Sequence, residues 1–419
     1  MSQPEKPQNR EAGRAVEAES ALWNLIPLSE FKPPAGAAPE AVRSGLHDLW
    51  QRLRGSGPHR DGTETDLEMD RPSQKLLDWA APQPDWAAEE MTGLESSLHS
   101  WLVVGATKAG VQTIVEAPLA IVRERLERWA VGQGYSLLPP PTPEQILRVD
   151  PDWLNALPLG SGQRLFLPRL ERCFLRHHNG LDLLRRLIEQ IDRLQPDLLL
   201  VCQSWAWRYL CQVEQIDAVL GAPLTPASFG DAELNRWLCG AAEKSSPYDL
   251  VFREASTGKT VLDTLHQSHS DDPNRSSFLK HLAARSRGNP RVAWDIWRRS
   301  LLTAKDSTVE KEAEEAAAGD KGYTLWVRPW DEVQLPDLVG GTTPLDGMVL
   351  YALLQHGGLP QAILADLLPA AISQVVYSLY QLRRAGLVQT ESDEWQPTPA
   401  GYPAVRRFLA EEGFLVDDL

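Results

Sequence analysis

The sequence has few cysteines, and their spacing excludes two common kinds of site. Four are spread over 419 residues, at Cys173, Cys202, Cys211 and Cys239. No two of them form a Cys-x-x-Cys pair, so zinc knuckles and dithiol redox motifs are excluded. We expect reduced thiols in the core of a cytoplasmic protein.

Long apolar runs and standard hydrolase motifs are missing too. No stretch reaches the roughly 18 uninterrupted apolar residues of a membrane-spanning helix. The first twenty residues are polar, which is not typical of a signal peptide. Neither Gly-x-Ser-x-Gly nor His-Glu-x-x-His occurs. Serine-hydrolase and zinc-protease chemistry are therefore not predicted, and we expect no metal site.

Basic residues are too few to favour nucleic acid. The chain has 42 Lys and Arg against 57 Asp and Glu, a net charge of −15. Residues 346–419 carry four basic and nine acidic side chains, a net charge of 4 − 9 = −5. Affinity for DNA depends largely on neutralising phosphates. We therefore expect protein–protein contacts rather than DNA binding, with a DNA-binding regulator as the alternative.

Hydrophobic patterning predicts an α/β protein. A continuous apolar run at 197–202 is typical of a buried parallel strand, and strands are also predicted at 101–104, 135–138 and 164–167. Three helices, a β-hairpin and a final helix after residue 346 predict a winged helix-turn-helix. The predicted segments are an N-terminal region of low order (1–72), an α/β core (73–245), a helical lid (246–304), a charged linker with a strand (305–345) and the winged helix (346–419).

The segment GATKAGVQT, residues 105–113, has the glycine spacing of a phosphate-binding P-loop. That motif reads Gly-x-x-x-x-Gly-Lys-Ser/Thr. Gly105 and Gly110 fit it, but Val111 replaces the lysine and Gln112 replaces the magnesium-binding hydroxyl. Lys108 lies inside the loop instead. We interpret the segment as a degenerate P-loop that follows the strand at 101–104.

Other parts of a nucleotide site follow in order. Pro168 ends a strand where a metal-binding acid is expected, and Glu171 lies three residues further on. Gln203 ends the next strand, where a polar residue that senses the γ-phosphate would lie. Gly288-Asn289-Pro290-Arg291 falls between two late helices.

With these parts, the chain resembles the AAA+ ATPases. It is most similar to the branch in which a core and helical lid precede a winged helix, the Orc/Cdc6-like initiators and related bacterial ATPases. The resemblance implies that Arg291 has the position of the lid sensor. Without the P-loop lysine, the hydroxyl and the acid, we expect no ATP hydrolysis and no bound cofactor. Weak ATP binding, or hydrolysis through Lys108 and Glu171, is the other alternative.

The resemblance predicts a function as a regulatory or scaffolding pseudo-ATPase of bacterial type. The expected partner is an active AAA+ ATPase of the same fold. Arg176 and Arg208 are candidates to supply an arginine to that partner's site. Trp205 and Trp207 are predicted to pack against the lid or against the partner.

Overall fold

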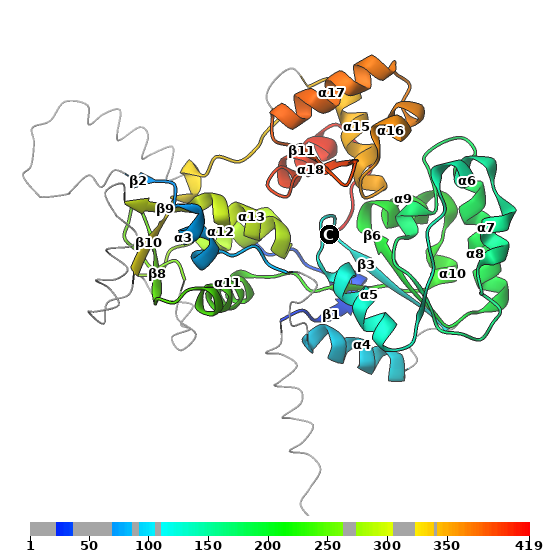
Figure 1. Ribbon diagram of the computed structural model, residues 1–419, viewed down its shortest axis with the longest axis horizontal. Helices are drawn as coiled ribbons and strands as arrows, with labels where there is room; N and C mark the ends of the chain where they lie inside the picture. Colours follow the sequence, from blue (N-terminus) through cyan, green and yellow to red (C-terminus); the bar gives the residue numbers. More distant parts are fainter. Residues whose placement is uncertain are drawn as a thin grey trace, which may run out of the picture. The chain divides into compact units, whose positions relative to one another are not determined.

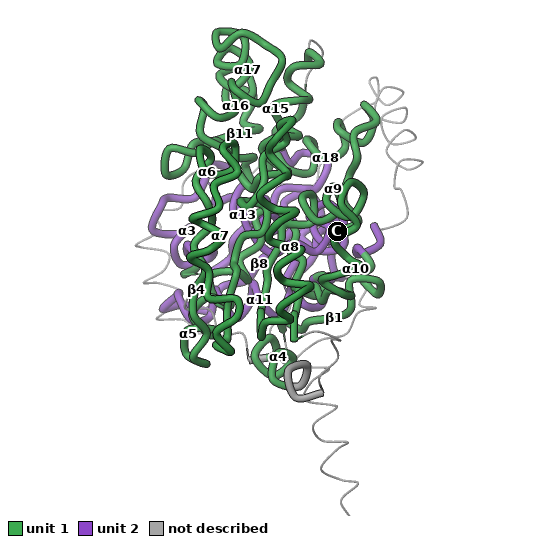
Figure 2. The backbone as a smooth tube through the Cα atoms, turned by 90° about the vertical axis from the view of Figure 1, so that its right-hand side faces the viewer, with its two compact units in different colours: residues 1–32, 84–228, 335–419 green, residues 33–83, 229–334 purple. Residues whose placement is uncertain are grey.

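The computed structural model describes residues 22–36, 69–85, 92–104, 110–262, 274–304, 323–338 and 342–419. They form two compact units (Figure 2). Unit 1 combines residues 1–32, 84–228 and 335–419, and unit 2 combines 33–83 and 229–334. These units divide the chain differently from the five predicted segments, because residues 335–419 belong with the α/β core. Among the described residues, no helix has the length and apolar character needed to cross a bilayer.

Unit 1 is built on a six-stranded sheet in the order β1-β7-β3-β6-β5-β4. Figure 1 labels its strands β1, β3 and β6. All its pairings are parallel except that of β1 with β7. This confirms the predicted α/β class with a parallel sheet. The strands are β1 (Leu25–Pro27), β3 (Val111–Glu116), β4 (Ser136–Leu137), β5 (Leu165–Leu167), β6 (Leu198–Gln203) and β7 (Leu224–Pro226). The helices of this part are α4 (Thr92–Val104), α5 (Val122–Gly132), α6 (Pro143–Arg148), α7 (Pro151–Ala156), α8 (Asp182–Leu194), α9 (Ser204–Glu214) and α10 (Asp217–Leu220).

The strand order creates a topological switch point between β3 and β6. From β3 the chain crosses to β4 at the sheet edge, and it returns through β5 to β6. From β6 it passes to β7, on the other side of β3. The connections thus leave β3 and β6 in opposite directions. Open α/β sheets bind ligands in the crevice outside the carboxyl ends of such strands. Here Glu116 ends β3 and Gln203 ends β6, and the two are register partners.

Residues 342–419 form the C-terminal module, whose elements occur where the winged helix was predicted. They are α15 (Pro344–Gln355), α16 (Gln361–Leu367), α17 (Ile372–Arg384), β11 (Val388–Glu391), β12 (Glu394–Pro397) and α18 (Tyr402–Glu411). A capping box starts α15, in which the Thr343 hydroxyl accepts from the Asp346 backbone N–H. Residues 349–355 are all buried because α15 packs against α17, α18 and α9.

Unit 2 contains helices around a second sheet, in the order β2-β9-β10-β8. Trp297 is fully buried there and contacts the rings of Phe252 and Phe278. The elements are β2 (Met69–Asp70), α3 (Gln74–Ala80), α11 (Asp231–Ser245), β8 (Leu250–Glu254), α12 (Phe278–Ser286), α13 (Pro290–Ser300), β9 (Leu301–Ala304) and β10 (Tyr323–Val327). The range predicted as a helical lid, 246–304, contains α12 and α13 and also the strands β8 and β9.

The predicted strand at 101–104 was wrong, because these residues end helix α4. A short apolar run does not distinguish a strand from a buried helix turn by periodicity. The true strand is β3, which has four β-branched residues among its six, VQTIVE. Side chains of that kind favour extended backbone.

Candidate functional site

The structure places the predicted P-loop residues at the wrong end of a strand. Gly110 precedes β3 with a positive φ of 68°, and a Cβ there would lie 3.0 Å from the Pro196 carbonyl oxygen. Val111 and Gln112 lie within β3 itself. Gly105 and Lys108 fall outside the described residues. A phosphate loop must follow the carboxyl end of its strand, where a helix begins. The interpretation of residues 105–113 as a degenerate P-loop was therefore wrong, and Gly110 serves the turn into β3.

The loop in the phosphate-binding position joins β3 to α5 and reads APLAI, residues 117–121. It has no glycine, lysine, serine or threonine. Pro118 has no N–H to offer, and Leu119 adopts a positive φ of 61° without being glycine. This loop lacks the side chains of a phosphate cradle.

Charged side chains fill the carboxyl edge of the sheet at the switch point. Arg123, in the first turn of α5, forms an ion pair with Glu116 and a second with Glu171 at 2.8 Å. The Gln203 backbone N–H donates to Glu171 Oε2 at 3.2 Å. Glu116 is 2% exposed and Glu171 is 0% exposed. We call Glu116, Arg123, Glu171 and Gln203 the switch-point cluster.

The charges of this cluster compensate one another. Burial raises the pKa of Glu116 to about 7, although the charge of Arg123 acts in the opposite direction. Burial alone would lower the pKa of Arg123, but both glutamates raise it above its usual range. Within the described ranges, Glu116 Oε2 is buried without a hydrogen-bond partner. One permanent cation thus faces two buried carboxyl groups.

The turn after α15 closes over the cluster. The Arg176 backbone N–H donates to His356 Nε2 at 3.4 Å, so this nitrogen is unprotonated. His356 Nδ1 therefore carries the proton and donates to the Glu171 carbonyl oxygen, also at 3.4 Å. Burial lowers the pKa of His356 to about 3, which keeps the ring neutral. At Gly357, with φ 63°, a Cβ would lie 3.4 Å from Glu171 Oε1.

Further contacts attach the C-terminal module to the sheet. Arg172 donates to both carboxylate oxygens of Glu394, at 2.8 and 2.6 Å, and to the Gly357 carbonyl at 3.0 Å. On the neighbouring strand end, Ser204 donates to Asp417, and Trp205 Nε1 donates to the Tyr402 hydroxyl at 3.2 Å. The pair between Arg172 and Glu394 is bidentate, and arginine–carboxylate pairs with this geometry are strong and directional.

The four residues predicted to contact a partner differ in their exposure to solvent. Trp205 and Trp207 are 1% and 6% exposed, so both belong to the core and are not accessible to a partner. Arg176 is exposed, with its guanidinium 5.1 Å from the centre of the Tyr351 ring. Arg208 Nη1 lies 3.6 Å from Asp418 Oδ2, and the Arg208 side chain is half exposed. Of the four, only the two arginines are at the surface.

Arg291 belongs to unit 2, where its motif starts helix α13. Asn289 is the N-cap, and its side chain accepts from the backbone N–H groups of Arg291 and Val292. Pro290 occupies the first helical position, which suits its fixed φ. The segment thus has a local structural function as a helix start.

The sequence identified part of the cluster and missed the rest. Gln203 ends β6 as predicted, and Glu171 lies past the end of β5. Pro168 follows β5 directly, so no acid stands at the strand end itself. Glu116, Arg123 and His356 were not predicted. The signal available for Glu116 was a carboxylate that ends a β-branched run.

Comparisons with known proteins find matches among solved structures only. No protein-family model matches the sequence, and no curated protein matches it. Among solved structures, the ORC2 protein of Aeropyrum pernix is 15% identical, covers 79% of this chain and 98% of its own, and has a TM-score of 0.37. Cdc6p from Pyrobaculum aerophilum is 13% identical, with 90% and 99% covered and a TM-score of 0.28. RuvB from Thermotoga maritima is 14% identical, with 78% and 94% covered and a TM-score of 0.29.

Each TM-score is below 0.5 and each identity is below 25%, so nothing that these proteins bind or do is carried over to this chain. The matching structures come from Orc/Cdc6-like proteins and RuvB, the groups that the sequence resemblance names, and their low TM-scores carry no further argument.

Proposed function

We propose that this protein is a non-catalytic, AAA+-like regulatory or scaffolding subunit that acts through protein–protein contacts. The observation that carries the proposal is the switch-point cluster. Arg123 lies at the start of α5, where a phosphate group would meet the helix N-terminus. Glu116 and Glu171 already supply the negative charge at that place. The chain's own carboxylates therefore take the position of a nucleotide phosphate.

A bound triphosphate would have to displace these internal pairs. Separating Arg123 from Glu171 leaves a buried charge without its partner, which costs about 3–5 kcal/mol. A phosphate would also bring further negative charge towards two carboxyl groups. Glu171 cannot serve as an exposed base for hydrolysis, because it is fully buried and bound by Arg123 and the Gln203 N–H. These features argue against the NTPase alternative.

Titration of the protein with MgATP is therefore expected to give no heat of binding. The physical reason is that the phosphate position holds an ion-paired cluster and no loop with lysine and hydroxyl groups. Isothermal titration calorimetry on the full chain measures this. Affinity tighter than about 100 μM, within the usual range for enzyme substrates, would contradict the proposal.

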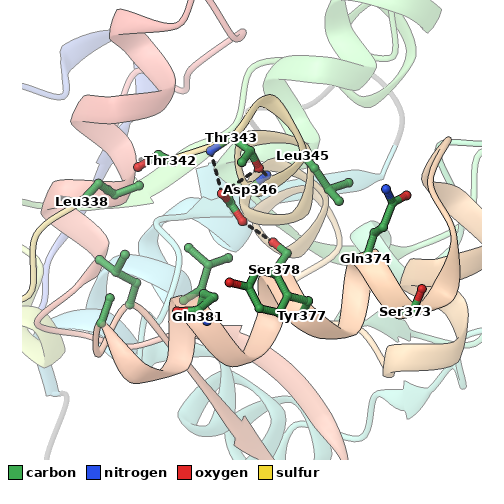
Figure 3. Close-up of a pocket in the computed structure, with 13 residues that line it drawn as sticks. Leu338, Thr342, Thr343, Leu345, Asp346, Ser373, Gln374, Tyr377, Ser378 and Gln381 are labelled. Atoms are coloured by element: carbon green, nitrogen blue, oxygen red, sulfur yellow. Dashed lines mark hydrogen bonds between the residues drawn. The ribbon is translucent and has the colours of Figure 1, made fainter. Parts of the chain in front are cut away.

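An exposed face of α17 is the surface that we propose for the partner. Ile372, Tyr377 and Tyr380 are 64%, 67% and 56% exposed there. Of these three, Tyr377 lines a groove of about 620 Å³ between α15 and α17 (Figure 3). At its wall, Ser378 donates to Asp346, which also accepts from the Thr343 N–H at 2.7 Å. Two exposed tyrosines on one helix, one of them lining a groove, are typical of the energetic centre of a protein interface.

The charge of this module favours a protein partner with basic residues over DNA. It carries nine acidic and four basic side chains over residues 346–419. The first basic residue of α17 is Arg383, near its last turn. Three of the nine acidic residues, Glu391, Asp393 and Glu394, lie at the turn between β11 and β12. With the resemblance to AAA+ proteins, the partner that we propose is an active ATPase of the same fold.

Replacing Tyr377 and Tyr380 together with serine is expected to abolish partner recovery, because the interface loses its two aromatic anchors. Affinity purification followed by mass spectrometry measures this, with a paired phenylalanine variant as the matched control. The wild type and the phenylalanine variant should recover an AAA+ ATPase. If the serine variant recovers it equally well, α17 is not the interface, and if no variant recovers an ATPase, the partner assignment is wrong.

A further inference from the structure

A second cavity of unit 1 lies where β4 and β5 end. Its volume is about 570 Å³, within the usual range for small-molecule sites. One wall is the run Pro139-Pro140-Pro141 that follows β4, and Leu359 of the C-terminal module also lines it. Arg169 and Arg172 line it from the segment after β5. We call this cavity the proline-lined pocket.

Among the described residues, Arg169 differs from the neighbouring arginines in having no ion pair. Arg123 holds Glu116 and Glu171, and Arg172 holds Glu394. In the described part of the chain, the Arg169 guanidinium makes no hydrogen bond and no ion pair. Burial lowers the pKa of Arg169, and the positive charges of Arg123 and Arg172 lower it further. Arg169 is therefore a half-buried cation that lines the pocket, and no described carboxylate forms an ion pair with it.

The acids near Arg169 are paired with other arginines or act on it through space only. Glu171 is paired with Arg123, and Glu394 is paired with Arg172. Glu127 also lines the pocket, and it acts on Arg169 through space without an ion pair. The planar N–H donors of a guanidinium match a carboxylate or phosphate, and Arg169 lines the pocket.

We propose that the proline-lined pocket binds a small organic oxyanion, with its carboxylate or phosphate on Arg169 and its apolar body against Pro139, Pro140 and Leu359. Ligand sites combine mostly apolar walls with a few polar groups that orient the ligand. The pocket follows the carboxyl ends of parallel strands, the edge at which open sheets bind ligands. This binding does not require the partner contact proposed above.

Fluorine NMR of the full chain with para-fluorobenzoate as the probe tests the proposal. We expect saturable binding of the benzoate and none of the neutral para-fluorobenzamide, because only the anion pairs with Arg169. Arg169→Met should weaken benzoate binding by about ten- to a hundredfold, the range expected for a lost charge-assisted hydrogen bond. Arg193→Met, an exposed position on α8, is the matched control and should bind like the wild type.

Phenyl phosphate is used in parallel to distinguish the two oxyanion head groups. Thermal unfolding without probe gives a second readout, since Arg169→Met removes a half-buried charge that has no ion pair among the described residues and should leave the midpoint unchanged or raised. The proposal is overturned if the wild type binds neither anion, if the amide binds equally well, or if Arg169→Met retains full affinity. Destabilisation by Arg169→Met would make the guanidinium a structural group and would overturn it too.

Discussion

Replacing Arg123 with methionine is expected to lower the free energy of unfolding by about 3–5 kcal/mol, because the change leaves buried carboxyl groups without their cation. Glu116 and Glu171 are 2% and 0% exposed, so water cannot replace the guanidinium. Methionine retains much of the apolar volume of the arginine stem, which limits the effect of a cavity. Urea denaturation at neutral pH measures the change.

Two further variants identify the cause of this loss. Arg128→Met changes an exposed residue of the same helix and should stay within about 0.5 kcal/mol of the wild type. Replacing the whole cluster, with Glu116→Gln, Arg123→Met and Glu171→Gln together, should recover much of the stability, because no unpaired charge is left. If the triple variant is no more stable than Arg123→Met alone, loss of the ion pairs is not the cause.

The decrease in the free energy of unfolding caused by Arg123→Met should also depend on pH. The folded-state pKa of Glu116, about 7, lies above its ordinary value of 4.5. Its contribution to stability is therefore fully present below pH 4.5 and is lost as pH rises through 7. Removing Arg123 takes away the charge that opposes this rise. We expect the destabilisation to be larger at pH 8 than at pH 6.

Replacing His356 with glutamine is expected to destabilise the protein most above pH 6.5, with a difference from wild type that shrinks as pH falls. The ring is fully buried, and its two nitrogens bond to the Arg176 N–H and the Glu171 carbonyl. An unsatisfied buried polar group costs about 1–3 kcal/mol. The pKa of His356 falls from 6.5 to about 3, so its contribution is present above 6.5 and is lost as pH falls through 3.

The difference in stability between the wild type and His356→Gln isolates the contribution of His356 to the pH dependence. Glu116 titrates in both proteins, so its opposite pH dependence largely cancels in the difference. His99→Gln, at an exposed position of α4, is the control and should give no such trend. Unfolding midpoints measured from pH 4 to pH 8 give the result. A difference that stays constant or grows as pH falls would show that the ring is not held neutral as described.

Strands and helices with strong local patterns were predictable from the sequence. All six residues of β6 are buried, and its apolar run was predicted as a strand that ends at Gln203. The helices and hairpin of the C-terminal module were predicted from their periodicity, and the structure has them in that order. These predictions succeeded because local apolar periodicity reflects which side of an element is buried.

The position of the phosphate loop could not be predicted in this way. Motif spacing placed it at 105–113, because the apolar run at 101–104 was interpreted as its strand. That run ends helix α4, and the strand begins at Val111. A glycine pair has no meaning for phosphate binding until it is known which end of a strand it occupies.

Composition and periodicity by themselves determined the α/β class, the acidic character of the C-terminal module and the positions of Glu171 and Gln203. Only the tertiary structure decided that Arg123 pairs with Glu116 and Glu171, and that His356 and Gly357 cover them. The distance along the chain explains this division, since Glu171 and His356 are 185 residues apart. Local patterns record which face of an element is buried, whereas the partner of a buried charge is set by the order in which strands are assembled into the sheet.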